Sequence, residues 1–167
     1  MRSLTAAPAS GTVSFRQPGT AGPRADRFER TLSQMKTAHH AGCVFNRQSS
    51  DLPDVPVHFD DAGALHGAFT ATELQQGYNG RMHGGMVAAL IDASMAQCLM
   101  GHGISGYTVN LSVKYRQPVT LFQTTHIITR ITGTAIGGSV YEMKCDLFQG
   151  RTRVAGATGR FFREKQT

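Results

Sequence analysis

Residues 77–100 read GYNGRMHGGMVAALIDASMAQCLM, and this stretch decides the expected fold. A glycine-rich turn at 77–80 precedes a segment in which twelve of the fifteen residues from Met86 to Met100 are apolar. The pattern predicts a helix over 82–100, with Gly84 and Gly85 near its start and Gly101 after its end. Because apolar residues surround this helix instead of forming one stripe, we expect it to be buried on nearly all sides.

Strand patterns lie on both sides of the helix. Residues 55–60 alternate, with Pro56 indicating an edge strand, and 65–73 form a second candidate. After the helix, strands are expected over 107–116, 123–132, 139–148 and 151–162, with Gln149-Gly150 as a hairpin turn. The strict alternation of 107–116 predicts one face made of Tyr107, Val109, Leu111, Val113 and Tyr115. The order β-β-α-β-β-β-β predicts an α+β domain, one helix on a mainly antiparallel sheet, and the sheet's remaining face and edge favour oligomerisation.

The chain divides into three parts by composition. Residues 1–25 are rich in Ala, Ser, Thr, Gly and Pro and are expected to form a flexible tail. This tail is an unstructured bacterial-type leader, an overextended start or a segment resembling an organelle transit peptide. Residues 26–54 are expected to hold a helix over 26–38, with Asp26 as N-cap, and a loop. Residues 55–167 form the main domain.

Charge and cysteine content narrow the function classes. The 167 residues carry a net charge of +6, and residues 81–167 contain ten basic residues against four acidic ones. A phosphorylated small molecule fits this charge. Nucleic acid is not expected, because aromatic RNA-binding motifs and zinc-finger spacing are absent.

No apolar run approaches the ~20 residues of a membrane span. Three widely spaced cysteines favour a reducing compartment, the cytoplasm. His39, His40 and Cys43 lack a second ligand cluster, so no metal is expected.

Two features of the helix point to chemistry. Gly84 and Gly85 lie where backbone amides have no intrahelical partner, so a carbonyl oxygen could approach these donors; alternatively the glycines only permit tight packing. Asp92 is the only acid between Glu73 and Glu142, and a buried carboxylate needs either a function or hydrogen-bond partners. Asp92 follows Gly85 by seven residues, roughly 10 Å along the helix, so one carbonyl cannot contact both. If both serve one reaction, two copies of the helix must contribute to the site.

The segment resembles the hotdog-fold acyl-CoA thioesterases of the phenylacetate-pathway type. Their motif is His-Gly-Gly at the start of a long central helix with an acid nine residues after the His, here His83-Gly84-Gly85 and Asp92. The resemblance extends through residues 108–118, TVNLSVKYRQP, and covers roughly 55–162. The chain departs from some relatives in having Gly77 where they have Asn, with Asn79 two positions later.

The resemblance implies hydrolysis of an acyl-CoA at the interface of a homodimer or a dimer of dimers. It implies that Asp92 is the general base or the nucleophile, that Gly84 and Gly85 polarise the thioester carbonyl and that Thr108 helps to place the water. His83 belongs to the same catalytic set. Asn79, Asn110, Lys114 and Arg116 are candidate substrate-binding residues, with Arg151 and Arg153 further candidates for the CoA phosphates. No metal or redox cofactor and no membrane partner are implied.

Two alternative functions are compatible with the same expected fold. A non-catalytic acyl-CoA-binding or sensing protein would not need Asp92. A hotdog dehydratase would pair a catalytic His and Asp in a different motif.

Overall fold

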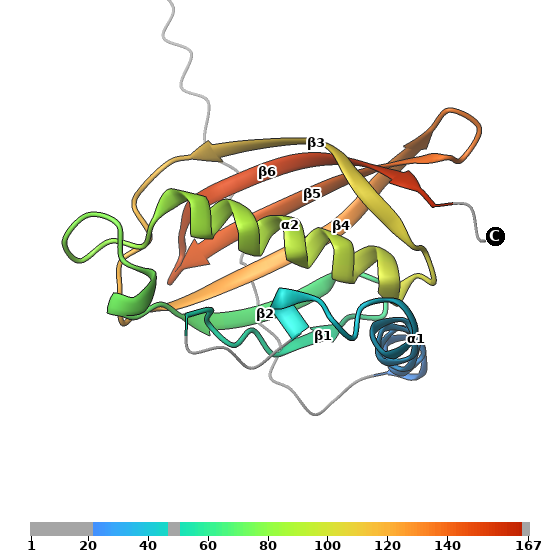
Figure 1. Ribbon diagram of the computed structural model, residues 1–167, viewed down its shortest axis with the longest axis horizontal. Helices are drawn as coiled ribbons and strands as arrows, with labels where there is room; N and C mark the ends of the chain where they lie inside the picture. Colours follow the sequence, from blue (N-terminus) through green and yellow to red (C-terminus); the bar gives the residue numbers. More distant parts are fainter. Residues whose placement is uncertain (1–21, 47–50, 165–167) are drawn as a thin grey trace, which may run out of the picture.

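A computed structural model describes residues 22–46 and 51–164, in which a six-stranded antiparallel sheet curls around one long helix (Figure 1). The helix α2 spans Gly84–Gly101, and α1 spans Pro23–His39. Two short 3-10 helices, η1 (Val44–Asn46) and η2 (Glu73–Gln75), lie in the connections. The strands are β1 (Val57–Phe59), β2 (Leu65–Thr70), β3 (Gly106–Tyr115), β4 (Thr124–Ala135), β5 (Val140–Gln149) and β6 (Thr152–Arg163).

The strand order is β1-β2-β4-β5-β6-β3, and every neighbouring pair is antiparallel. The predicted α+β class and element order are confirmed, and β1 lies at an edge as Pro56 indicated. The other edge is β3, which is 10 residues long. The predicted strand 65–73 was too long, because Thr72 caps η2 in a reciprocal capping box with Gln75.

Helix α2 packs on the concave face of the sheet. Its sheet-facing side includes Ile91, Met95 and Leu99, each at most 1% exposed. The hydroxyl of Ser94 lies 2.9 Å from that of Thr129, so this buried polar pair is satisfied. The opposite stripe is only partly buried, and its members are small or polar: Ala88, Ala89, Asp92, Ala93 and Ala96. The prediction that α2 is buried on nearly all sides is therefore wrong within a single copy of the chain. No described segment of that copy covers this stripe completely.

Strand β3 changes phase at a β-bulge. Thr108 pairs with Phe161, but Asn110, two residues later, pairs with the adjacent Arg160, so Val109 is the extra residue. The bulge puts Thr108 on the helix side together with Leu111, Val113 and Tyr115, and leaves Val109 52% exposed. The predicted single face from Tyr107 to Tyr115 was wrong for this reason: one inserted residue reverses the alternation.

Helix α1 begins earlier than predicted. Pro23 is the first helical residue and Gly22 is the N-cap, so Asp26 lies inside the first turn. Ala25 is fully buried, and its amide donates to Asp61 Oδ1 at 3.2 Å. Residues 22–25 therefore belong to the folded unit instead of the predicted tail, and residues 1–21 lie outside the described part of the chain. The predicted apolar face is observed, with Leu32 buried and Phe28 and Met35 packed against the core.

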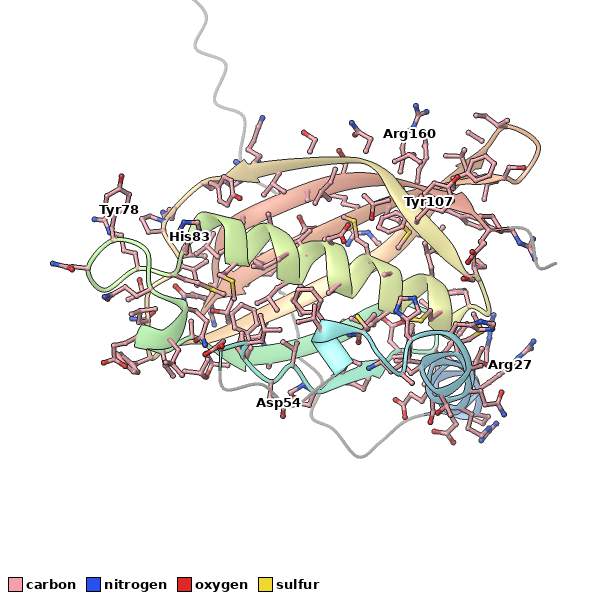
Figure 2. The ribbon with its side chains drawn as sticks, in the orientation of Figure 1. Arg27, Asp54, Tyr78, His83, Tyr107 and Arg160 are labelled. Carbon is pink, nitrogen blue, oxygen red and sulfur yellow. The ribbon has the colours of Figure 1, made fainter. Side chains whose placement is uncertain are left out.

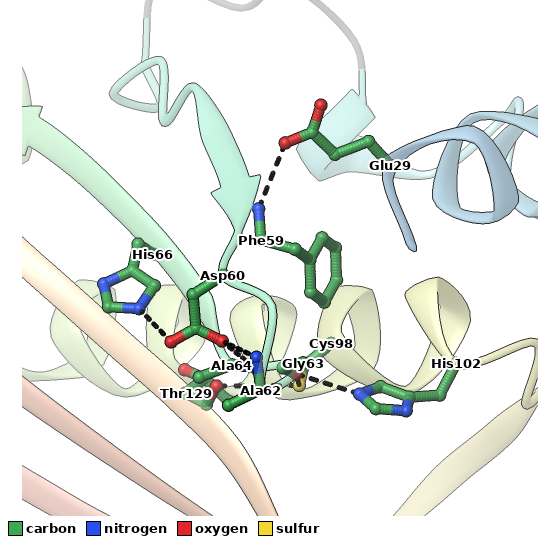
Figure 3. A network of polar contacts seen from close by, with 10 residues as sticks. All are labelled: Glu29, Phe59, Asp60, Ala62, Gly63, Ala64, His66, Cys98, His102 and Thr129. Atoms are coloured by element: carbon green, nitrogen blue, oxygen red, sulfur yellow. Dashed lines mark hydrogen bonds and ion pairs between the residues drawn. The ribbon is translucent and has the colours of Figure 1, made fainter. Parts of the chain in front are cut away.

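The turn between β1 and β2 connects both helices to the sheet (Figure 3). Asp60 accepts hydrogen bonds from the amides of Ala62 and Ala64 and lies 3.0 Å from Nε2 of His66. Burial alone would raise the pKa of Asp60, but the His66 ring and the two amides outweigh it and lower that pKa. His102, the C-cap of α2, places Nε2 2.9 Å from the Gly63 carbonyl.

By length and composition, α2 is apolar enough to cross a membrane, with half of its residues buried in the domain. The expectation that no segment comes near that length was therefore too strict. The buried core helix of an α+β domain has the same length and composition, and α2 is the core helix of this domain.

We predict that Gly101→Ala destabilises the fold by about 1–3 kcal/mol, the usual cost of overpacking. Gly101 is buried at the end of α2, and a Cβ there would overlap the ring of Phe59, itself 1% exposed. Urea unfolding measures the effect. Gly133→Ala is the matched control, because its Cβ would meet only the flexible Glu142 side chain, with the carboxylate oxygen at 3.3 Å, and we expect less than half the effect. Equal stability of the two variants would contradict the packing described.

The three cysteines should differ sharply in reactivity. Burial raises the pKa of Cys98 to about 12 and that of Cys145 to about 11, whereas Cys43 is partly exposed. A thiol reagent at pH 8 should therefore label one thiol rapidly in the native protein and all three in denaturant. Cys43→Ser should abolish the rapid phase, and rapid labelling that survives this substitution would show that the core opens.

Candidate functional site

The start of α2 is built around His83. This residue is the N-cap, and its Nδ1 accepts a hydrogen bond from the Gly85 amide at 3.0 Å. Its own amide donates to the Gln75 carbonyl at 2.8 Å, which fixes the entry into the helix. The amide of Gly85, one of two predicted carbonyl donors, is thus occupied by a side chain in this structure. The amide of Gly84 makes no hydrogen bond to any described residue.

Tyr115 connects β3 to the same helix start. Its hydroxyl donates to the Gly84 carbonyl at 2.8 Å, and its ring lies beside Gly84. Sequence reasoning treated Tyr115 only as an apolar strand position and missed this contact. The signal in the sequence is weak: a tyrosine at the end of a strand, before the Arg-Gln-Pro turn, with its partner thirty-one residues away.

An open cleft of about 290 Å³ lies at this end of the helix, lined by Gly77, Tyr78, Met82, His83 and Gly84. Figure 2 shows Tyr78 and His83 together at the N-terminal end of α2. Tyr78 is 84% exposed, and Asn79 is exposed beside it on the turn. The structure thus places Asn79 on the turn before the helix start, where its side chain makes no hydrogen bond to the described residues.

Asp92 and Thr108 form the second part of the candidate site. The Thr108 hydroxyl donates to Asp92 Oδ1 at 2.6 Å, and both residues are half-buried on the stripe side of α2. The bulge at Val109 makes this contact possible, because it turns Thr108 toward the helix. Asp92 Oδ2 makes no hydrogen bond to the described residues, so it can accept one from water or substrate. Full burial of Asp92 was expected and is not observed in one chain.

The predicted substrate-binding residues of β3 lie elsewhere. Register puts Asn110 opposite Arg160 and Lys114 opposite Gly156, on the sheet face away from α2. Arg116 follows the strand and is exposed. Within one chain the structure therefore separates all three from Asp92.

Several basic residues of the C-terminal half form ion pairs with acidic residues of the sheet. Arg153 forms an ion pair with Asp146, and Arg130 lies 3.5 Å from the same carboxylate. Arg160 pairs with Glu142 at 3.0 Å. Arg153 was a candidate for phosphate binding, and its partner Asp146 competes with that role, whereas Arg151 is exposed in the β5–β6 turn. Across residues 22–46 and 51–164, no group of three or more His, Cys, Asp or Glu is placed to hold a metal ion.

The chain is similar to known proteins in two ways, by a family model that matches part of its sequence and by solved structures that share its fold. The family model of the thioesterase superfamily matches residues 79–155, which include the helix start, Asp92 and Thr108. No curated protein matches the chain in sequence.

Solved structures share the fold at low sequence identity. The Escherichia coli PaaI protein of the phenylacetic acid degradation operon superposes with a TM-score of 0.69 at 14% identity, covering 86% of this chain and 98% of that one. Thioesterase superfamily member 2 from Mus musculus gives 0.63 at 17%, covering 81% and 96%. A hypothetical thioesterase from Streptococcus pneumoniae, solved with coenzyme A, gives 0.62 at 19%, covering 71% and 94%. The chain has the hotdog fold of these structures, and its segment 79–155 matches the thioesterase superfamily.

Proposed function

We propose that the protein hydrolyses the thioester bond of an acyl-CoA, with Asp92 as the residue that activates water. The observation that carries the proposal is the Asp92–Thr108 hydrogen bond on the partly uncovered stripe of α2. This pair holds one carboxylate oxygen with a hydroxyl and leaves the other available. The unpartnered amide of Gly84 at the start of the same helix supplies the donor that a developing oxyanion requires.

The proposed reaction is a general-base hydrolysis. Water adds to the thioester carbon while its proton passes to Asp92, with Thr108 fixing the orientation of the carboxylate. The carbonyl oxygen becomes an oxyanion beside the Gly84 amide and the positive end of the α2 dipole. The carbon–sulfur bond then breaks, and the proton held by Asp92 passes to the leaving thiolate. Direct attack by Asp92, through an anhydride that water hydrolyses, uses the same groups.

The two halves of this site come from two chains in our proposal. Gly84 and Asp92 are eight residues apart on one helix, about 12 Å along its axis, so one carbonyl group cannot contact both. The stripe of small residues on α2 allows a second helix to approach closely, and the outer edge of β3 has no strand partner among the described strands. Joining two copies at β3 would satisfy this edge and place Asp92 of one copy near Gly84 of the other.

The comparisons support the substrate class. Coenzyme A is bound in the Streptococcus pneumoniae structure, and acetyl CoA in a Streptococcus mutans protein that covers 75% of this chain at 17% identity and a TM-score of 0.62. Solved mutants of the former protein include an Asp-to-Ala and a Thr-to-Ala change at positions sixteen residues apart. Asp92 and Thr108 have the same spacing and are in contact. The free cysteines suit the cytoplasm as the proposed location.

We predict that Asp92→Asn lowers kcat on acyl-CoA substrates by a factor on the order of 10² or more, since it keeps the shape and removes the base. Substrate binding should change far less. Thr108→Val should lower kcat by a smaller factor, because Asp92 keeps its charge but loses its orientation. Thiol release and the melting temperature are measured on the same preparations. An Asn variant that keeps its turnover would assign Asp92 a structural role and favour a non-catalytic acyl-CoA binder.

We also predict that activity depends on assembly. Ala96→Arg puts a long charged side chain on the stripe one turn beyond Asp92, and it should yield a monomer without turnover. Ala38→Arg, on the exposed side of α1, is the matched control and should leave both properties unchanged. Sedimentation at assay concentration gives the oligomeric state. A wild-type monomer with full turnover would contradict the shared site.

A further inference from the structure

We infer that His83 and Tyr115 are positioning residues that hold the two ends of the Gly84–Gly85 peptide group. This occupies the Gly85 amide, orients the residue Gly84 and leaves the Gly84 amide, in the preceding peptide group, as the one that polarises the substrate carbonyl. The inference deepens the proposed function and rests on it for one point, that the Gly84 amide polarises the thioester carbonyl. The hydrogen bonds themselves are independent of that role.

Both contacts fall on one peptide group. The Gly84 carbonyl accepts from the Tyr115 hydroxyl at 2.8 Å, and the Gly85 amide donates to Nδ1 of His83 at 3.0 Å. The carbonyl and the amide of this group point in opposite directions, so a partner at each end fixes its rotation. The helix itself restrains only the carbonyl end of this group, because the Gly85 amide is one of the first four amides, which have no intrahelical acceptor.

The remaining amides of the first turn are accounted for. Those of Met86 and Val87 donate to the His83 carbonyl at 3.0 and 3.1 Å. Gly85 donates to the His83 side chain, which leaves Gly84 as the only one of the first four amides without a partner in the described structure. Gly84 also lines the cleft, so its donor and the space for a ligand are found together.

Glycines on both sides make room for the imidazole. A Cβ on Gly77 would lie 3.0 Å from His83 Cα and 3.2 Å from its Cδ2, and a Cβ on Gly85 would lie 3.0 Å from Nδ1. The ring is thus packed between two residues that have no side chain. Because Nδ1 accepts a hydrogen bond, the proton of the neutral ring is on Nε2. The geometry therefore gives His83 the role of a fixed acceptor, and not that of an acid acting through Nδ1.

Tyr115 links this end of the site to the other. It lies on β3, the strand that also carries Thr108, and both side chains contact α2. One strand therefore contacts both the residue that carries the proposed base and the residue that carries the proposed carbonyl donor. We expect loss of the Tyr115 hydroxyl to impair catalysis while leaving the packing of its ring intact.

The test compares His83→Asn with His83→Ala, and Tyr115→Phe with Tyr107→Phe. Asparagine is a good N-cap acceptor, so His83→Asn should keep kcat within about threefold, whereas His83→Ala should lower it at least tenfold. Tyr115→Phe should lower kcat about tenfold with KM within threefold. Tyr107→Phe, on the opposite face of β3, should change neither. If His83→Asn is as inactive as His83→Ala, His83 transfers a proton and the inference is overturned.

Amide exchange in ¹⁵N-labelled protein gives a readout that does not need activity. Exchange of the Gly85 amide should be slow in the wild type and in His83→Asn, and at least tenfold faster in His83→Ala. Unchanged exchange in His83→Ala would overturn the clamp whatever the kinetics show. A wild-type protein that protects Gly85 in this pattern but cleaves no acyl-CoA would support the clamp and refute the proposed function.

Discussion

The fold depends on burying a helix that is too apolar to face water. Removing its side chains from solvent is worth roughly 1.5–3 kcal/mol for each large residue, so packing against the sheet determines where α2 lies. Ile91, Met95 and Leu99 contribute to this contact from the helix, and Met143, Cys145 and Leu147 from β5. Once α2 is fixed by its sheet side, its first turn and its opposite stripe are left for other uses. Both parts of the candidate site lie in those two places.

The sequence predicted this arrangement because it is governed by local patterns. Alternation located the strands, the apolar run located α2, and Pro56 identified an edge. In each of these cases the information lies within a few residues or within one repeating period. The pairing of Asp92 with Thr108 was expected only from the resemblance to the thioesterases, because the alternation of β3 put Thr108 on the face opposite Leu111 and Val113.

What the sequence could not predict depends on contacts between distant residues. The bulge at Val109 leaves no local mark, because either phase of β3 looks regular by itself; only pairing with β6 decides between them. The donation from Tyr115 to Gly84 depends on that phase. Pairing of Arg153 with Asp146 likewise required the sheet register, and without it the arginine looked available for a ligand. The start of α1 was missed because Ala25 is stabilised by Asp61, which follows it by thirty-six residues.

The bulge also determines where β3 can vary in length. Upstream of Val109 the side chains alternate in one phase, and downstream in the other, so the strand joins two segments that are each matched to the sheet. Removing Val109 itself would bring the segments into a single phase in which Thr108 and Leu111 both still face α2 and Asn110 still faces away. Removing a residue between Leu111 and Tyr115 while Val109 stays would instead turn part of the strand over. Thr108 would then turn away from Asp92, or Asn110 or Lys114 would turn into the apolar layer under α2. The strand can therefore lose one residue at position 109, but not in the segment that follows it.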